Sequence, residues 1–306
     1  MSRTSLFITV LIFAMIALAA WLYQSSQHEE LTPWDLVSTD AVVVLDITNY
    51  AAFTQRAGSF PILASVMHQN RALHLLRVTN QKVNGLIISF HPISADDFAT
   101  TIIMSANSID LQLVDRYFAT RSELTAIERT YNGSVITEYK SPNGESVSIS
   151  KLDELVVLTT SPILIEGAIR LYNANSANIF RKENAKLFQL PSLQSDHGNI
   201  YINSGNLEKM LTLFTQPAQS NKNMLDFGKG ALIDLKIDSS RLLLNGFVTD
   251  KNDDGFSSSF ADQKPTSLDI SRYISNRSAF VLEAKFSNVN DWLHTRALAF
   301  EKAQPD

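Results

Sequence analysis

Carboxylate and amide side chains gather in one short stretch of the sequence, Asp250-Lys251-Asn252-Asp253-Asp254-Gly255. Asp250, Asn252 and Asp254 fall on positions 1, 3 and 5 of the EF-hand calcium loop, and a glycine follows at position 6. Position 12, where that loop uses a bidentate glutamate, is Ala261. The flanking residues resemble a strand and a Ser-rich loop rather than two helices. The stretch therefore predicts either a weak calcium site or an acidic, solvated linker.

Other patterns with catalytic potential are incomplete. Ser148 and Lys151 have the S-x-x-K spacing of penicillin-binding enzymes, but the sequence has no K-T-G partner motif, so we interpret this match as coincidence. No two histidines have the i, i+4 spacing of a helical zinc site, and we expect His68 and His74 on the exposed side of their helix. These patterns favour a protein that is not an enzyme and has no catalytic residues.

Paired carboxylates are one further route to acid–base chemistry. Asp46 and Glu283 each end an apolar run, and they could approach each other if the two runs form equivalent strands. Strand-end acids more commonly stabilise the turn that follows. The absence of cysteine excludes disulfides, thiol catalysis and cysteine-based metal sites. Calcium is therefore the one cofactor that the sequence suggests.

Composition bounds the class of protein. The 306 residues are 45% hydrophobic and 19% charged, which is enough apolar sequence for one or two packed domains. The net charge is −5 and there is no basic run. Nucleic-acid binding needs a basic surface, so we expect no nucleic-acid partner.

The N-terminus contains a membrane-type segment. Residues Leu6–Tyr23 contain no charge, and as a helix they would span about 27 Å, close to the hydrocarbon core of a bilayer. Two readings remain open: an uncleaved signal anchor after a cytoplasmic tip at residues 1–5, or a cleaved signal peptide with an Ala17-Leu18-Ala19 site that would release an exported soluble protein. Arg3 precedes the segment and no basic residue follows until Arg56, which predicts an inner-membrane protein with its ectodomain in the periplasm.

Strand and helix signals after the spacer at residues 24–33 come in runs rather than in strict alternation, which predicts an α+β class with antiparallel sheet and packed helices. Turn signals at Asn132-Gly133 and Asn143-Gly144 predict an antiparallel meander over residues 125–159. A second hairpin is expected over residues 230–249. Ser59 and Pro61 predict one helix that continues through Leu76.

A phrase near the start of the folded region recurs near the end. Val44-Leu45-Asp46 followed by Asn49 resembles Val281-Leu282-Glu283 followed by Asn288, so each copy reads as a strand and then an Asn-capped helix. Either the chain holds a duplicated unit or a common local pattern occurs twice. We accordingly expect an ectodomain over residues 34–249, an acidic and Ser-rich linker over 250–264, and over 265–306 either an incomplete second unit or a closing element of the first.

The anchor, the opening "PWDLVSTDAVVVLDITN" and the later "PTSLDISRYISNRSAFVLEAKFSNVNDW" together resemble a group of uncharacterised Bacteroidota membrane-anchored envelope proteins, whose ectodomain is a domain of unknown function of the 3352 type. Ser38 stands where that group usually has proline. The resemblance implies a tethered envelope protein and assigns no catalytic residues. We therefore expect a non-enzymatic binding or assembly module. Residues 6–23 would contact the membrane, and the module would bind another envelope protein. The alternatives are a ligand or calcium binder and an unrecognised envelope hydrolase.

Overall fold

A computed structural model of the chain describes residue 15 and residues 31–303, except 79–82, 84, 95–96, 122–123, 175–177, 191–196, 212–228, 239–240, 250–256, 261, 265, 268–269, 276, 279–280, 282 and 284. The chain divides into two compact units, residues 1–32 and residues 33–306. The proposed membrane segment Leu6–Tyr23 lies outside the described residues apart from Met15. No helix among the described residues is both long enough and apolar enough to cross a membrane.

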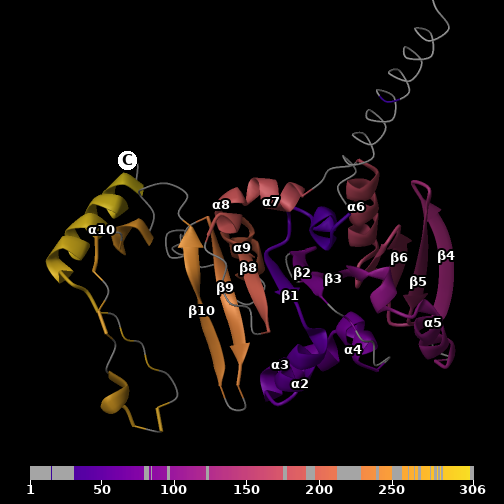
Figure 1. Cartoon of the computed structure of the whole chain (residues 1–306), viewed down its shortest axis with the longest axis horizontal. Coiled ribbons are helices and arrows are strands. Elements are labelled where there is room, and N and C mark those ends of the chain that lie inside the picture. The colour runs from indigo at the N-terminus through magenta and orange to yellow at the C-terminus, as the bar shows by residue number, and fades with distance from the viewer. Residues whose placement is uncertain are drawn as a thin grey trace, which may run out of the picture. The chain divides into compact units, whose positions relative to one another are not determined.

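The second unit is built on one antiparallel sheet, whose strands in the described part of the chain follow the order β10-β9-β8-β1-β2-β3-β7-β6-β5-β4 (Figure 1). This mixture of helices and antiparallel sheet confirms the α+β class. The strands are β1 (Val43–Ile47), β2 (Leu86–Pro92), β3 (Phe98–Ser105), β4 (Thr125–Tyr131), β5 (Ser134–Lys140), β6 (Ser146–Leu152), β7 (Leu155–Thr159), β8 (Gly198–Asn203), β9 (Gly230–Ile237) and β10 (Leu242–Thr249).

The predicted meander and hairpin are confirmed. Strands β4 to β7 pair with their chain neighbours, as do β9 and β10. Asn132 and Gly133 have φ of 46° and 85°, the left-handed backbone that a tight Asn-Gly hairpin turn requires. The sequence signals located these pairs because each is local. The central position of β1, between β8 and β2, joins residues far apart in the chain and had no such signal.

Helices connect and cover the strands. Asn49 caps α2, accepting a hydrogen bond from Ala52 N at 3.0 Å. The single helix predicted from Pro61 through Leu76 is wrong, because Asn70 ends one helix and caps the next, accepting from Leu73 N at 3.1 Å. The helices are α2 (Tyr50–Ala57), α3 (Pro61–Gln69), α4 (Arg71–Val78), α5 (Leu111–Ala119), α6 (Pro162–Asn173), α7 (Ile179–Glu183), α8 (Ala185–Phe188), α9 (Ser204–Leu211) and α10 (Val289–Ala303), with short 3₁₀ turns at Pro33–Leu36 (η1) and Ser257–Phe260 (η4) among others.

Side chains alternate along each strand, so the sheet has two faces, and helices cover both (Figure 1). The face under α2 to α5, here called the α2–α5 face, holds the main hydrophobic core. Helix α6 packs on the opposite face, the α6 face, against β3, β5, β6 and β7. The core on the α2–α5 face joins Ile47, Ile88, Ile102, Leu158 and Ile149 of the sheet to Phe53, Met67, Leu73, Val114 and Phe118 of the helices.

Of the sequence pattern that occurs twice, the structure repeats the Asn-capped helix but not the strand before it. Asn288 caps α10 as Asn49 caps α2, with Asn288 Oδ1 accepting from Asn290 N at 3.1 Å. The prediction of a strand before α10 is wrong for the described residues of that segment, since neither Val281 nor Glu283 belongs to a strand. A duplicated unit therefore stays a prediction that rests on the sequence alone.

Candidate functional site

The calcium hypothesis falls on Asp250, Asn252 and Asp254, all outside the described residues, which end at Thr249 and resume at Ser257. It stays a prediction. Elsewhere in the described part of the chain, no three histidine, aspartate or glutamate residues are grouped closely enough to hold a metal ion.

The carboxylate pair considered from the sequence is not brought together. Asp46 lies on β1 beside Trp34, whose indole donates a hydrogen bond to it, and near the Arg181 guanidinium. Burial raises the pKa of the Asp46 carboxyl, and these two neighbours oppose that rise. Glu283 instead accepts from Ile270 N at 3.3 Å and lies 3.8 Å from Lys285 Nζ. Each acid thus has its own local partners.

Strand geometry keeps the two side chains of the S-x-x-K match apart. Ser148 and Lys151 both lie on β6, and residues three apart on a strand point to opposite faces. Ser148 is fully buried on the α6 face, whereas Lys151 is exposed on the α2–α5 face. A lysine cannot activate a serine through the sheet, so the interpretation of coincidence has a physical basis.

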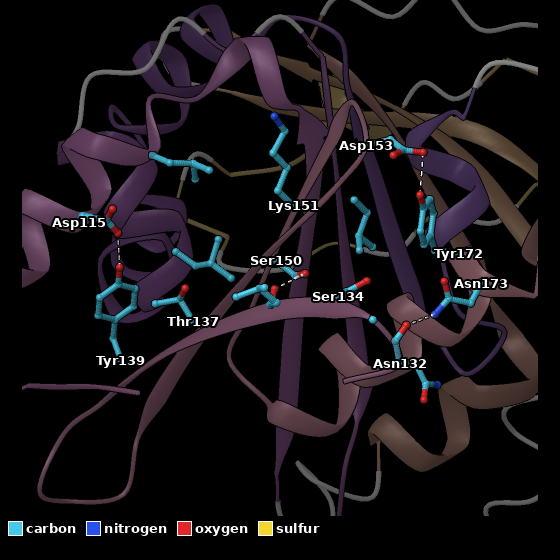
Figure 2. Close-up of a pocket in the computed structure, with 15 residues that line it drawn as sticks. Asp115, Asn132, Ser134, Thr137, Tyr139, Ser150, Lys151, Asp153, Tyr172 and Asn173 are labelled. Carbon is cyan, nitrogen blue, oxygen red and sulfur yellow. Dashed lines mark hydrogen bonds between the residues drawn. The ribbon is translucent and has the colours of Figure 1, made fainter. Parts of the chain in front are cut away.

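A cavity of about 610 Å³ lies on the α2–α5 face, where α5 leaves β5 and β6 partly uncovered (Figure 2). Alternation along β5 brings Val135, Thr137 and Tyr139 to its floor. Ile149, opposite Thr137 in the strand register, and Lys151 extend the floor onto β6.

Hydrogen bonds hold the rim of this cavity. The Tyr139 hydroxyl donates to Asp115 of α5, and the Tyr172 hydroxyl donates to Asp153 Oδ2 at 2.7 Å. Asn173 Nδ2 donates to the main-chain oxygen of Asn132 at 3.0 Å, which ties the end of α6 to the β4–β5 turn. These bonds connect α5, α6 and two hairpin turns, so they position the rim.

The same bonds change the acidity of the two phenols. Burial raises the pKa of Tyr139, and the bond to the Asp115 carboxylate raises it further. The Asp153 hydrogen bond is the main cause of the raised pKa of Tyr172. Both tyrosines therefore stay protonated and act as donors at neutral pH.

Three polar groups of the cavity are not committed to this framework. Ser134 Oγ, Thr137 Oγ1 and Lys151 Nζ have no hydrogen-bond partner within the described residues. The nearby Ser150 hydroxyl is occupied, since it donates to Val135 O at 2.8 Å. The cavity thus combines a fixed rim with free donors and acceptors and with the apolar side chains of Val135 and Ile149 in its floor, the arrangement of a preformed small-molecule site.

Sequence reasoning did not find this cavity. The Asn-Gly turn and the alternation of Val135, Thr137 and Tyr139 were visible signals for a half-exposed strand. The incomplete cover by α5 was not, because it depends on how α5 packs against β5 and β6, two strands that come later in the chain. Comparison with known proteins adds no assignment: the chain matches no protein-family model, no curated protein and no solved structure.

Proposed function

We propose that this chain is a membrane-tethered envelope protein whose α+β ectodomain is a non-enzymatic binding module, and that the 610 Å³ cavity takes a small, hydroxyl-rich ligand of the saccharide type. The uncharged segment Leu6–Tyr23 and the asymmetry of basic residues around it support the tether and the periplasmic location. The opening phrase supports kinship with the Bacteroidota envelope group.

The observation that carries the binding role is the set of free groups inside a fixed rim. Ser134, Thr137 and Lys151 can donate to hydroxyl oxygens, and the two hydroxyls can also accept. The apolar side chains of Val135 and Ile149 between them suit the C–H surface of a sugar ring. A ligand that both donates and accepts in several directions satisfies this set better than an ion does.

The hydrogen bonding inside the cavity favours binding over catalysis. A hydrolytic site needs a nucleophile in contact with a base. Asp115 and Asp153 are instead bonded to tyrosine hydroxyls, and Ser150 is bonded to a main-chain carbonyl. Within the described part of the cavity, no serine or threonine hydroxyl is bonded to a carboxylate or an imidazole.

Saturation-transfer NMR on the full-length protein in detergent micelles tests the ligand class, with glucose, N-acetylglucosamine and maltotriose as probes. We expect saturable binding of at least one of them. Lys151→Met and Ser134→Val should each weaken that binding about three- to tenfold, the value of one hydrogen bond. Lys182→Met, the same change on the exposed surface of α7, is the matched control and should have no effect. Binding that is absent, or equal in all variants, refutes the proposed ligand site.

Fractionation of the native cells tests the tether separately. Wild-type protein should remain with the inner membrane after salt and carbonate washes, while a double variant, Leu11→Lys with Ala14→Lys, should not insert. Recovery of the wild-type protein in the soluble fraction would contradict the anchor and favour the cleaved signal peptide.

A further inference from the structure

A second cavity, of about 340 Å³, lies on the α2–α5 face beyond Tyr139, whose ring borders both hollows. His74 of α4 and Arg121, just after α5, contribute the basic part of its wall. Tyr117 and Phe118 contribute aromatic rings, with Phe118 stacked on Tyr139 at 3.9 Å between ring centroids. The cavity is therefore basic on one side and aromatic on the other.

Further positive charge stands behind His74. Arg77 Nη1 lies 2.8 Å from Nε2 of His68, and the His68 and His74 rings are 5.9 Å apart. We name His68, His74, Arg77 and Arg121 the basic cluster. Three helices supply it: α3, α4 and the end of α5. Their packing brings Arg121 to the same cavity wall as His74, which lies close to His68 and Arg77 in the sequence as well.

The basic cluster lacks acidic partners. None of its four residues forms an ion pair with a carboxylate in the described part of the chain. Two described acids from neighbouring elements have other partners: Asp115 accepts from the Tyr139 hydroxyl, and Glu145 Oε2 accepts from Asn143 Nδ2 at 3.1 Å. The Nδ1 atom of His74 is buried with no hydrogen-bond partner among these residues. Burial lowers the pKa of His74, and Arg77, Arg121 and His68 lower it further, which is the signature of uncompensated positive potential.

We propose that this second cavity is an anion-binding site that accepts a phosphate group carried on an aromatic or apolar body. Arg121 and His74 hold the phosphate, since a guanidinium fork and an imidazole N–H match phosphate oxygens, and Arg77, which lies against the His68 ring, adds positive potential behind them. The body of the ligand lies against Tyr117 and Phe118. Arg121 already stacks on Tyr117, with its guanidinium carbon 4.1 Å from the ring centroid, so the fork is oriented before the ligand arrives.

Helix ends offer a competing explanation for the same residues. His68, Arg77 and Arg121 lie at or just beyond the C-terminal turns of their helices, where basic side chains stabilise the helix dipole. That role explains each residue singly. It predicts a loss of stability on substitution and no anion binding, so an equilibrium binding measurement separates the two explanations.

The test is calorimetric titration of the full-length protein in detergent micelles with three probes: phenyl phosphate, inorganic phosphate and phenol. We expect phenyl phosphate to bind most tightly, because it alone engages both the basic and the aromatic wall. Arg121→Gln and His74→Gln should each weaken phenyl phosphate binding about tenfold, the value of one charge-assisted hydrogen bond. Higher ionic strength should weaken binding in the wild type.

Matched variants keep the test decisive. Arg116→Gln removes an equal charge from the exposed side of α5, away from the cavity, and should leave binding unchanged within twofold. Asn143→Asp adds a carboxylate at the opposite wall, on an exposed turn, and should weaken binding even if a cluster variant fails to fold. The proposal is overturned if the wild type shows no saturable phosphate binding, if phenol binds as tightly as phenyl phosphate, or if Arg116→Gln weakens binding as much as Arg121→Gln.

Discussion

Replacing Arg129 tests how the first cavity is held from the opposite side of the sheet. Glu138 lies on β5 between Thr137 and Tyr139 but faces α6, and its side chain is only 3% exposed. Arg129 Nε lies 2.6 Å from Glu138 Oε1, and Arg129 Nη1 lies 2.7 Å from Glu166 Oε1 of α6. Arg129 thereby connects the edge strand β4, strand β5 and the helix whose last turn reaches the cavity rim.

The expected cost follows from these contacts. Arg129→Ala removes two charge-assisted hydrogen bonds, each worth about 1.5–3 kcal/mol in favourable settings. Two features reduce the sum: Arg129 is 31% exposed, and Glu138 keeps Lys140 Nζ at 2.8 Å. We therefore expect a loss of about 2–3 kcal/mol in the free energy of unfolding, measured by urea denaturation of the full-length protein. Arg129→Lys keeps the charge without the fork and should lose about half as much.

The effect should depend on pH in a defined direction. Burial pushes the pKa of Glu138 up, but the hydrogen bonds from Lys140 and Arg129 outweigh it, so the pKa in the folded protein is below that in the unfolded chain. The stability from this group is then fully present above the unfolded pKa and is lost as pH falls through the folded pKa. The wild type and Arg129→Ala should differ most near pH 7 and converge below about pH 4.

Two outcomes would refute this reasoning. A loss below about 1 kcal/mol would mean that the network is as weak as a surface pair. A difference that persists at low pH would mean that Arg129 acts through packing rather than charge. Arg241→Ala is the matched control, because its contact with Asp238 at 3.2 Å is exposed on both sides and should contribute less than about 0.5 kcal/mol.

Three further predictions concern other parts of the fold. The hydrogen bond from buried His91 Nδ1, at 3.1 Å, helps lower the pKa of Asp40 to about 2 against the raising effect of burial. Because the Asp40 side chain is 51% exposed, Asp40→Asn should lower the free energy of unfolding by at most about 1 kcal/mol. The variant should also show a smaller fall in stability between pH 4 and pH 2 in acid titrations. A Cβ at Gly246 would lie 2.1 Å from a carbonyl oxygen of β9, so Gly246→Ala should cost at least about 1–3 kcal/mol in urea unfolding, whereas Gly167→Ala in α6 meets no closer contact than 3.8 Å and should gain about 0.5–1 kcal/mol. Trp34 is 6% exposed, and its ring centroid lies 4.9 Å from that of Tyr201. Trp34→Ala should therefore lower the free energy of unfolding by about 3–5 kcal/mol and reduce the near-UV circular dichroism. An unchanged melting temperature would contradict the place of Trp34 in the core.

Local chemistry accounts for what could be predicted of the fold. Asn132-Gly133 specifies its own turn, because the backbone angles of that turn are available to Asn and Gly at little cost. Asn49 specifies the start of α2 through a hydrogen bond three residues away. Such signals are complete within a few residues. By the same reasoning, Asn70 is a local capping signal, and it divides α3 from α4 although the apolar stripe through Leu76 predicts one helix.

The sequence by itself determined the α+β class, the meander, the hairpin and the apolar segment at residues 6–23. Only the tertiary structure decided that β1 lies between β8 and β2, that Ser148 and Lys151 face opposite sides, and that His74 is half-buried beside Arg121 rather than exposed. These facts depend on pairings and packing between residues far apart in the chain, which no local pattern encodes. Both cavities are of this kind, because the first exists only where α5 leaves β5 and β6 partly uncovered, and the second only where α4 and α5 pack on the same face of the sheet.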